Sequence, residues 1–130
     1  MIIEFTVETT PYPQPRPRVV RRHAFEPKRI TEYKNIIRTF AKIHMKGREP
    51  CKNLVQVSLT FRRNRRLGSH TFGDIDNLSK AVLDALNGVC YSDDALVVKL
   101  VACKDSDKNE GVDISVTDEF EGGLIPCKSH

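Results

Sequence analysis

The spacing of apolar and polar residues along the chain predicts four strands and two helices. Strands are expected where apolar side chains alternate with polar ones or form a short run, at residues 2–8, 54–61, 96–102 and 112–116. Helices are expected where apolar residues recur every three or four positions, at residues 31–46 and from Asp76 or Asn77 to about residue 88. The resulting order β-α-β-α-β-β indicates an α+β fold, in which a mixed β-sheet packs with two main helices.

Two segments between these elements are rich in basic residues. Residues 11–18 carry proline at every second position, which excludes a helix and keeps this segment extended, with Arg16 and Arg18 on it. The loop at residues 62–73 is long for so small a domain, which is typical of a functional or a disordered segment. Its four arginines are Arg62, Arg63, Arg65 and Arg66.

Residues 105–113 resemble the calcium-binding loop of an EF-hand in the spacing of their aspartates. Such a loop requires glycine at its sixth position and glutamate at its twelfth, and this chain has Glu110 and Val116 there. We therefore interpret the segment as a hairpin turn between the last two strands.

Length and composition favour a single intracellular domain. A chain of 130 residues, of which 39% are hydrophobic, fits one core. We expect residues 1–120 to form this domain and residues 121–130, which lack any pattern, to form a flexible C-terminal tail. The first residues lack the basic and apolar regions of a secretory signal, and no stretch approaches the roughly 18 apolar residues of a membrane helix. We expect a soluble, cytoplasmic protein.

The cysteines do not follow the spacing of a zinc site. No C-x-x-C pair occurs among Cys51, Cys90, Cys103 and Cys127. We expect free thiols, most of them packed as small hydrophobic side chains, rather than zinc ligands or disulfides.

The formal net charge of +4 hides an uneven distribution of charged residues. Residues 1–66 contain 16 Lys and Arg against 5 Asp and Glu, a net +11, whereas residues 67–130 contain 5 against 12, a net −7. The simplest explanation of this uneven distribution is chance, since the surface carries many charged residues. An enzyme that cuts phosphodiesters would also have this distribution, because its cations neutralise phosphates and its carboxylates hold metal ions. The helix at residues 31–46 carries a basic ridge that either is solvated or follows phosphates: Lys34, Arg38, Lys42 and Lys46.

Three aspartates and a lysine form a candidate metal site. Asp74 and Asp76 precede or begin the second helix, and Lys80 lies one turn after Asp76 on the same face. Asp93 and Asp94 form a turn after this helix, and we expect that turn to fold back and bring three carboxylates together. Such a set suits Mg²⁺, with Mn²⁺ as a substitute. Each motif alone is also common as a helix cap or a turn.

The chemistry of phosphodiester hydrolysis explains why these residue types would be used. One or two Mg²⁺ ions deprotonate water and stabilise charge on the phosphoryl and leaving oxygens. A neighbouring ammonium group, here Lys80, stabilises the negative charge that develops.

The same residues resemble a known family of nucleases. Its signature is D-x-D-N-L-x-K, then D-A-L, then D-D before an apolar strand. This chain has Gly73-Asp74-Ile75-Asp76-Asn77-Leu78-Ser79-Lys80, Asp84-Ala85-Leu86-Asn87-Gly88 and Tyr91-Ser92-Asp93-Asp94. These runs closely resemble the RusA family of Holliday-junction resolvases, and Pro15-Arg16-Pro17-Arg18 resembles its early proline-rich and basic segment. The matches together span roughly residues 10–100.

The resemblance implies a homodimeric, Mg²⁺-dependent endonuclease that cuts four-way DNA junctions with paired nicks in recombination and repair, without a nucleotide cofactor. It implies Asp74, Asp76 and Asp94 as metal ligands and Lys80 as the essential lysine. Asp93 remains an alternative to Asp94. We expect the DNA to be held by the six arginines Arg16, Arg18, Arg62, Arg63, Arg65 and Arg66.

Three questions remain open at this point. Leu83 and the ends of both helices are candidates for the dimer interface. Phe72 either anchors the basic loop in the core or is exposed as a wedge that opens the branch point. The competing class is a non-catalytic, branched-DNA-binding accessory protein of recombination, whose aspartates would serve only as caps. An unrelated phosphatase or nucleotide hydrolase is disfavoured by the basic half and by the lack of a glycine-rich phosphate loop.

Overall fold

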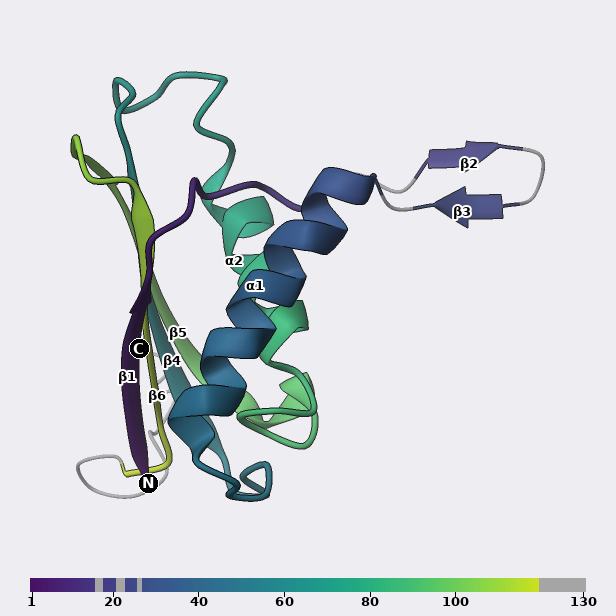
Figure 1. Cartoon of the computed structure of the whole chain (residues 1–130), viewed down its shortest axis with the longest axis vertical. Coiled ribbons are helices and arrows are strands. Elements are labelled where there is room, and N and C mark those ends of the chain that lie inside the picture. The colour runs from purple at the N-terminus through teal and green to yellow at the C-terminus, as the bar shows by residue number, and fades with distance from the viewer. Residues whose placement is uncertain (16–17, 21–22, 26, 120–130) are drawn as a thin grey trace, which may run out of the picture.

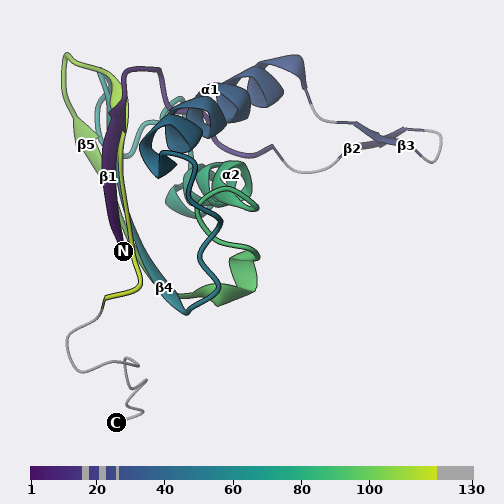
Figure 2. The same ribbon diagram turned by 60° about the horizontal axis from the view of Figure 1, so that its bottom comes forward.

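Two helices cover one face of a four-stranded sheet, and a separate two-stranded hairpin lies beyond the start of the first helix (Figure 1). The computed structural model of the chain describes residues 1–15, 18–20, 23–25 and 27–119. The segment predicted to be a flexible tail, residues 121–130, lies outside them. Seen from the second direction, both helices lie on the same side of the sheet (Figure 2).

The predicted order of elements is confirmed, with one hairpin and one short 3-10 helix added. The elements are β1 (Ile2–Val7), β2 (Arg18–Val20), β3 (His23–Phe25), α1 (Lys28–Met45), β4 (Val55–Arg63), α2 (Ile75–Leu86), η1 (Asp94–Leu96), β5 (Val97–Ser106) and β6 (Gly111–Thr117). Within the described part of the chain, no helix combines the length and apolar character that crossing a membrane requires.

The strands of the main sheet lie in the order β1-β6-β4-β5. β4 pairs in parallel with β5 and antiparallel with β6, so the predicted mixed sheet is confirmed. The predicted hairpin turn at residues 105–113 is wrong, because β4 separates β5 from β6. The connection instead crosses the end of β4, where the N–H of Asp107 donates to the carbonyl of Arg63 (3.0 Å). Alternation along a strand identifies the strand but not its neighbour, which explains the error.

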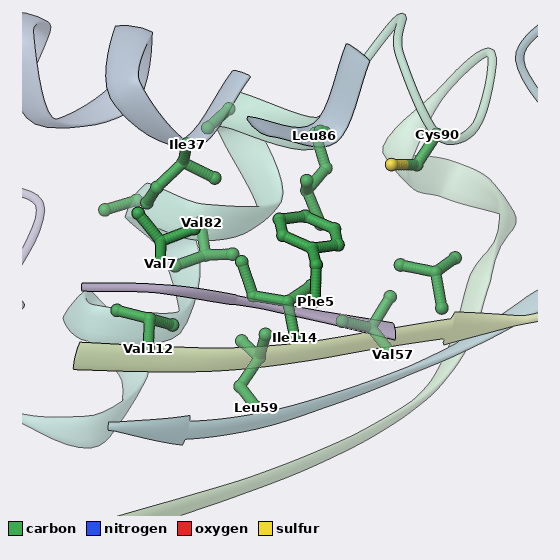
Figure 3. Packing of buried hydrophobic residues seen from close by; sticks show 14 of the residues in the cluster. Phe5, Val7, Ile37, Val57, Leu59, Val82, Leu86, Cys90, Val112 and Ile114 are labelled. Atoms are coloured by element: carbon green, nitrogen blue, oxygen red, sulfur yellow. The ribbon is translucent and has the colours of Figure 1, made fainter. Parts of the chain in front are cut away.

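The core lies between the sheet and the two helices (Figure 3). In β4, every second side chain from Val55 to Phe61 is buried, as the alternating pattern predicts. These side chains meet Ile37 of α1 and Val82 of α2, which are fully buried. Each large apolar side chain buried in this way contributes about 1.5–3 kcal/mol. The Leu83 side chain is half-buried and also packs against this cluster.

The basic ridge of α1 serves mainly to hold α2. The ammonium group of Lys34, only 10% exposed, lies 3.4 Å from the carboxylate of Asp84. The guanidinium of Arg38 donates to the carbonyls of Ala85 (3.1 Å) and Asp84 (3.3 Å). These carbonyls belong to the last turn of α2, whose acceptors lack partners within the helix. A phosphate-following role is therefore excluded for Lys34 and Arg38, whereas Lys42 remains exposed.

Two of the cysteines are buried free thiols. Cys51 and Cys90 are buried and unpaired, as predicted, and burial raises the pKa of Cys90 to about 12. Cys103 is a free thiol on the surface, and Cys127 lies outside the described residues. Among the described residues, none of the cysteines belongs to a group that could bind a metal ion.

Phe72 anchors the basic loop in the core. Its side chain is 0% exposed, and the ammonium group of Lys104 lies 5.0 Å from the ring centroid. The same ammonium group donates to the carbonyl of Gly73 (2.9 Å). The wedge interpretation is therefore wrong, because a side chain buried in this way cannot reach DNA.

We predict that Phe72→Ala lowers the free energy of unfolding by about 3–5 kcal/mol, because it leaves a cavity in the core. Urea unfolding followed by circular dichroism measures this loss. Leu67→Ala is the matched control in the same loop, and since Leu67 is 56% exposed, its unfolding midpoint should stay near that of the wild type. Equal midpoints for the two variants would contradict the anchoring role.

Candidate active site

Asp74 and Asp76 lie at the start of α2 with exposed side chains. Asp74 is the N-cap residue, and its carbonyl accepts a hydrogen bond from the N–H of Leu78 (2.9 Å). One carboxylate oxygen of Asp76 accepts from the N–H of Asn77 (2.9 Å). The free N–H groups at the start of a helix stabilise negative charge.

Close packing around Gly73 holds the backbone just before Asp74. Gly73 has a φ of 96°, and a Cβ atom there would lie 2.9 Å from the Pro13 ring. Only glycine combines this backbone conformation with this approach. The N–H of Gln14 donates to the carbonyl of Asn77 (2.9 Å), and Lys104 donates to the carbonyl of Gly73, as described above. The start of the proline-rich segment and the end of β5 therefore fix the position of the two aspartates.

Lys80 lies on α2 one turn after Asp76, and its side chain is exposed. Residues four apart on a helix are neighbours on its surface, so the predicted placement of Lys80 beside Asp76 agrees with the helix bounds. Asp84, one further turn along α2, forms an ion pair with Lys34 of α1. Lys80 is the basic residue of α2, and it lies one turn from the two aspartates.

The structure distinguishes Asp93 from Asp94. The carboxylate of Asp93 caps η1 by accepting from the N–H of Ala95 (3.0 Å). This hydrogen bond is the main reason why the pKa of Asp93 lies below its usual value. Asp94 is the first residue of η1 and is exposed. Asp93 therefore has a structural role, and Asp94 is the better candidate ligand.

Asp94 does not join Asp74 and Asp76 within one chain. α2 has 12 residues and spans about 18 Å at its regular rise. Asp74 precedes the helix and Asp94 follows it, so they belong to opposite ends of the helix layer (Figure 1). Among the described residues, no group of three His, Cys, Asp or Glu side chains is arranged to hold a metal ion. One chain therefore supplies two carboxylates at the start of α2 but not three.

The expectation that the Asp93–Asp94 turn folds back toward Asp74 is wrong, because this turn is fixed at the end of α2. The hydroxyl of Tyr91 donates to the carbonyl of Leu83 (2.8 Å). The N–H of Ser92 donates to the carbonyl of Cys51, just before β4 (2.9 Å). The turn therefore leads directly into β5 beside the start of β4.

The arginines of the basic loop divide into two pairs. Arg62 and Arg63 are 16% and 12% exposed and form ion pairs with acidic residues near β6. Arg62 lies 3.0 Å from Asp113, and Arg63 also donates to the carbonyl of Thr71. Both side chains therefore stabilise the fold, and we do not assign them to phosphate binding. Arg65 and Arg66 are exposed.

The two arginines of the proline-rich segment are only partly covered by the structure. Arg16 lies outside the described residues, and for Arg18 only the backbone is described, at the start of β2. The hairpin of β2 and β3 was not predicted, since its strands have three residues each and show no clear alternation.

Lys104 is a supporting residue that sequence reasoning missed. It lies beside Phe61 in the parallel pair of β4 and β5, on the face of the sheet that carries the helices. Its sequence context is an ordinary polar strand end, so nothing in the spacing points to its contact with Gly73, which is 31 residues away.

Comparison with known proteins identifies the family of the chain. A family model described as Endodeoxyribonuclease RusA matches residues 8–117. This range includes the proline-rich segment, both helices and the Asp93–Asp94 turn. None of the curated proteins matches the chain. Since the match covers most of the sequence, the chain belongs to the RusA endodeoxyribonuclease family.

Proposed function

We propose that this protein is a Mg²⁺-dependent endonuclease that resolves four-way DNA junctions by paired phosphodiester hydrolysis. Membership of the RusA family supports a DNA endonuclease. The observation that carries the proposal is the exposed pair Asp74 and Asp76 at the start of α2, with Lys80 one turn further on. Recombination and repair in the cytoplasm supply such a substrate.

Mg²⁺ is the proposed cofactor, with Mn²⁺ as a substitute. Carboxylate oxygens are the ligands that these hard cations prefer, and Asp74 and Asp76 supply them. Asp94 is the proposed third ligand. Because one chain holds it at the other end of α2 from Asp74 and Asp76, it comes from the second copy of the proposed homodimer. When bound, the metal supplies Lewis acidity and a nucleophilic water.

The remaining chemistry falls to side chains of the chain itself. Lys80 places a positive charge beside the reacting phosphate and stabilises the charge that develops there. Arg65 and Arg66 hold the DNA backbone close to Asp74, because their loop leads directly into α2. The hairpin of β2 and β3 provides a second contact, since the segment before it packs on Gly73.

A non-catalytic protein that binds branched DNA is the alternative. It would require Asp74 and Asp76 to act only as helix caps, but Asp74, the N-cap residue, makes no side-chain cap bond. Incubation of the protein with a labelled four-way junction, a linear duplex and a single strand, each with and without Mg²⁺, separates the two functions. Binding of the junction without metal-dependent nicking would overturn the nuclease proposal.

We predict that Asp74→Asn, Asp76→Asn and Asp94→Asn each abolish junction cleavage and leave junction binding largely intact. Amide replacement keeps the shape of the side chain but removes the charge that binds Mg²⁺. Cleavage assays and mobility shifts measure the two effects. Glu49→Gln is the control, because it removes an exposed carboxylate after α1. Two aspartate variants that cut at the wild-type rate would show that the site is elsewhere.

We predict that Lys80→Ala lowers the single-turnover cleavage rate by about 10²–10³, while the Kd for the junction changes only a few-fold. The reason is that a cation at the reacting phosphate acts mainly on the transition state. The control is Lys42→Ala, an exposed lysine of α1. Equal losses of rate and affinity would make Lys80 a simple phosphate anchor.

We predict that the double change Arg65→Ala and Arg66→Ala reduces the slope of log Kd against log salt concentration by about two, close to one for each lost phosphate contact. Lys42→Ala with Lys52→Ala removes the same charge from exposed positions outside the loop and serves as the control. An unchanged slope in the arginine variant would remove this loop from the DNA surface.

A further inference from the structure

The start of the proline-rich segment joins the first turns of the two helices. The guanidinium of Arg29, in the first turn of α1, lies 4.4 Å from the centroid of the Tyr12 ring. Two residues after Tyr12, the N–H of Gln14 donates to the carbonyl of Asn77, in the first turn of α2 (2.9 Å). Figure 1 shows this segment running from the end of β1 past the start of α1. Arg29 is therefore held close to the helix start that carries the two aspartates.

Tyr12 is a fixed platform for the guanidinium. Its ring packs edge-on against Tyr33 of α1, which is buried, with the ring centroids 5.8 Å apart. The next residue, Pro13, packs on Gly73. A guanidinium that lies over an aromatic ring keeps its N–H groups for hydrogen bonds in its own plane. Tyr12 therefore orients Arg29 without using its donors.

The first turn of α1 carries positive charge that its own side chains do not balance. Lys28 and Arg29 stand in this turn, which contains no acidic residue, and the N-cap residue makes no side-chain cap bond. The start of a helix already carries partial positive charge, so cations are unfavourable there and anions are favourable. Lys28 lies 3.8 Å from the Glu32 carboxylate. Within the described residues, no carboxylate forms an ion pair with Arg29.

Basic residues of the helix layer that stabilise the fold are arranged differently. Lys34 lies 3.4 Å from the Asp84 carboxylate, and the guanidinium of Arg38 donates to backbone carbonyls of α2. The donors of both side chains are used inside the molecule. Arg29 is exposed and lies over a ring, which leaves its donors to an acceptor from outside the chain.

We propose that Arg29, supported by Tyr12, binds a phosphate of the DNA strand that is cut, close to Asp74 and Asp76. This inference rests on the proposed function, because the DNA is the substrate of that site. The planar guanidinium matches two oxygens of a phosphate with parallel hydrogen bonds. Phosphate contacts position a nucleic acid without reading its sequence. Lys80 thus acts on the reacting phosphate, and Arg29 holds a neighbouring phosphate of the same strand.

A change of Arg29 to glutamine tests the contact, because it removes the charge and keeps much of the side-chain length. We expect the Kd for a four-way junction, measured by mobility shift without Mg²⁺, to rise about tenfold, and the slope of log Kd against log salt concentration to fall by about one. The contact is made before and during the reaction, so the cleavage rate at saturating protein should fall by less than the affinity.

The stability of the same variant separates binding from a structural role. Arg29→Gln loses the contact with Tyr12 but also removes an unfavourable charge from a helix start. We expect these effects to offset each other, so the thermal unfolding midpoint should stay close to that of the wild type. A lowered midpoint together with an unchanged salt slope would make Arg29 a structural residue and overturn the proposal.

Lys28→Gln is the matched control, since it removes the same charge one residue away from a side chain that lies beside Glu32. Its Kd and salt slope should remain near those of the wild type. Arg29→Lys keeps the charge and should retain the wild-type slope. Equal values of Kd and slope in Arg29→Gln and Lys28→Gln would overturn phosphate binding by Arg29, and so would an Arg29→Lys slope as low as that of Arg29→Gln.

Neutral methylphosphonates identify the phosphate that Arg29 contacts. Each phosphate of the cut strand is replaced in turn, and the Kd is measured for the wild type and for Arg29→Gln. At one position we expect the replacement to weaken binding of the wild type but not of the variant, because the two changes remove the same interaction. If every replacement affects both proteins equally, Arg29 does not contact the strand and the proposal is overturned.

These binding measurements do not depend on cleavage, so the two proposals can fail separately. A wild type that binds the junction through Arg29 and never nicks it with Mg²⁺ overturns the proposed function alone. A wild type that nicks the junction, with no difference between Arg29→Gln and Lys28→Gln in binding, overturns the role of Arg29 alone. A wild type that binds no DNA overturns both.

Discussion

The parallel pairing of β4 and β5 is the constraint on which the arrangement of the site depends. Two parallel neighbours cannot be joined by a tight turn, so the chain must return along the sheet before the second strand begins. α2 is that return. The residues before and after it, Asp74 and Asp94, are therefore held at opposite ends of the sheet. The contacts of α1 with the last turn of α2 keep this crossover in place.

This constraint bears on the proposed chemistry. Within one chain, α2 separates Asp94 from Asp74 and Asp76, so one copy does not bring the three carboxylates together. The homodimer that we propose supplies the third carboxylate from the second copy, and its two-fold symmetry matches a substrate with two equivalent cleavage points.

Much of the fold followed from periodicity. The stripe through Ile37 and Ala41 predicted α1, and the alternation from Val55 to Phe61 predicted β4. Periodicity says which side of an element is buried, but not which element lies beside it. It therefore could not separate β5 from β6, and it could not reveal that Arg62 forms an ion pair with Asp113, 51 residues away.

The candidate site was predictable to a similar extent. The positions of Asp74, Asp76 and Lys80 on α2 follow from local spacing, because all three depend on where one helix begins. The position of Asp94 depends on whether a turn folds back, and hydrogen bonds from Tyr91 and Ser92 decide this. The choice between a buried and an exposed Phe72 likewise depends on Lys104 and the rest of the core, not on its neighbours in sequence.

The anchoring of Phe72 and Gly73 has a consequence for the evolution of this loop. These two residues fix the end of the loop just before the aspartates, while residues 64–68 are exposed. Exposed loop tips tolerate insertions and deletions. The length and charge of this tip can therefore change without displacing Asp74 from the helix that holds it.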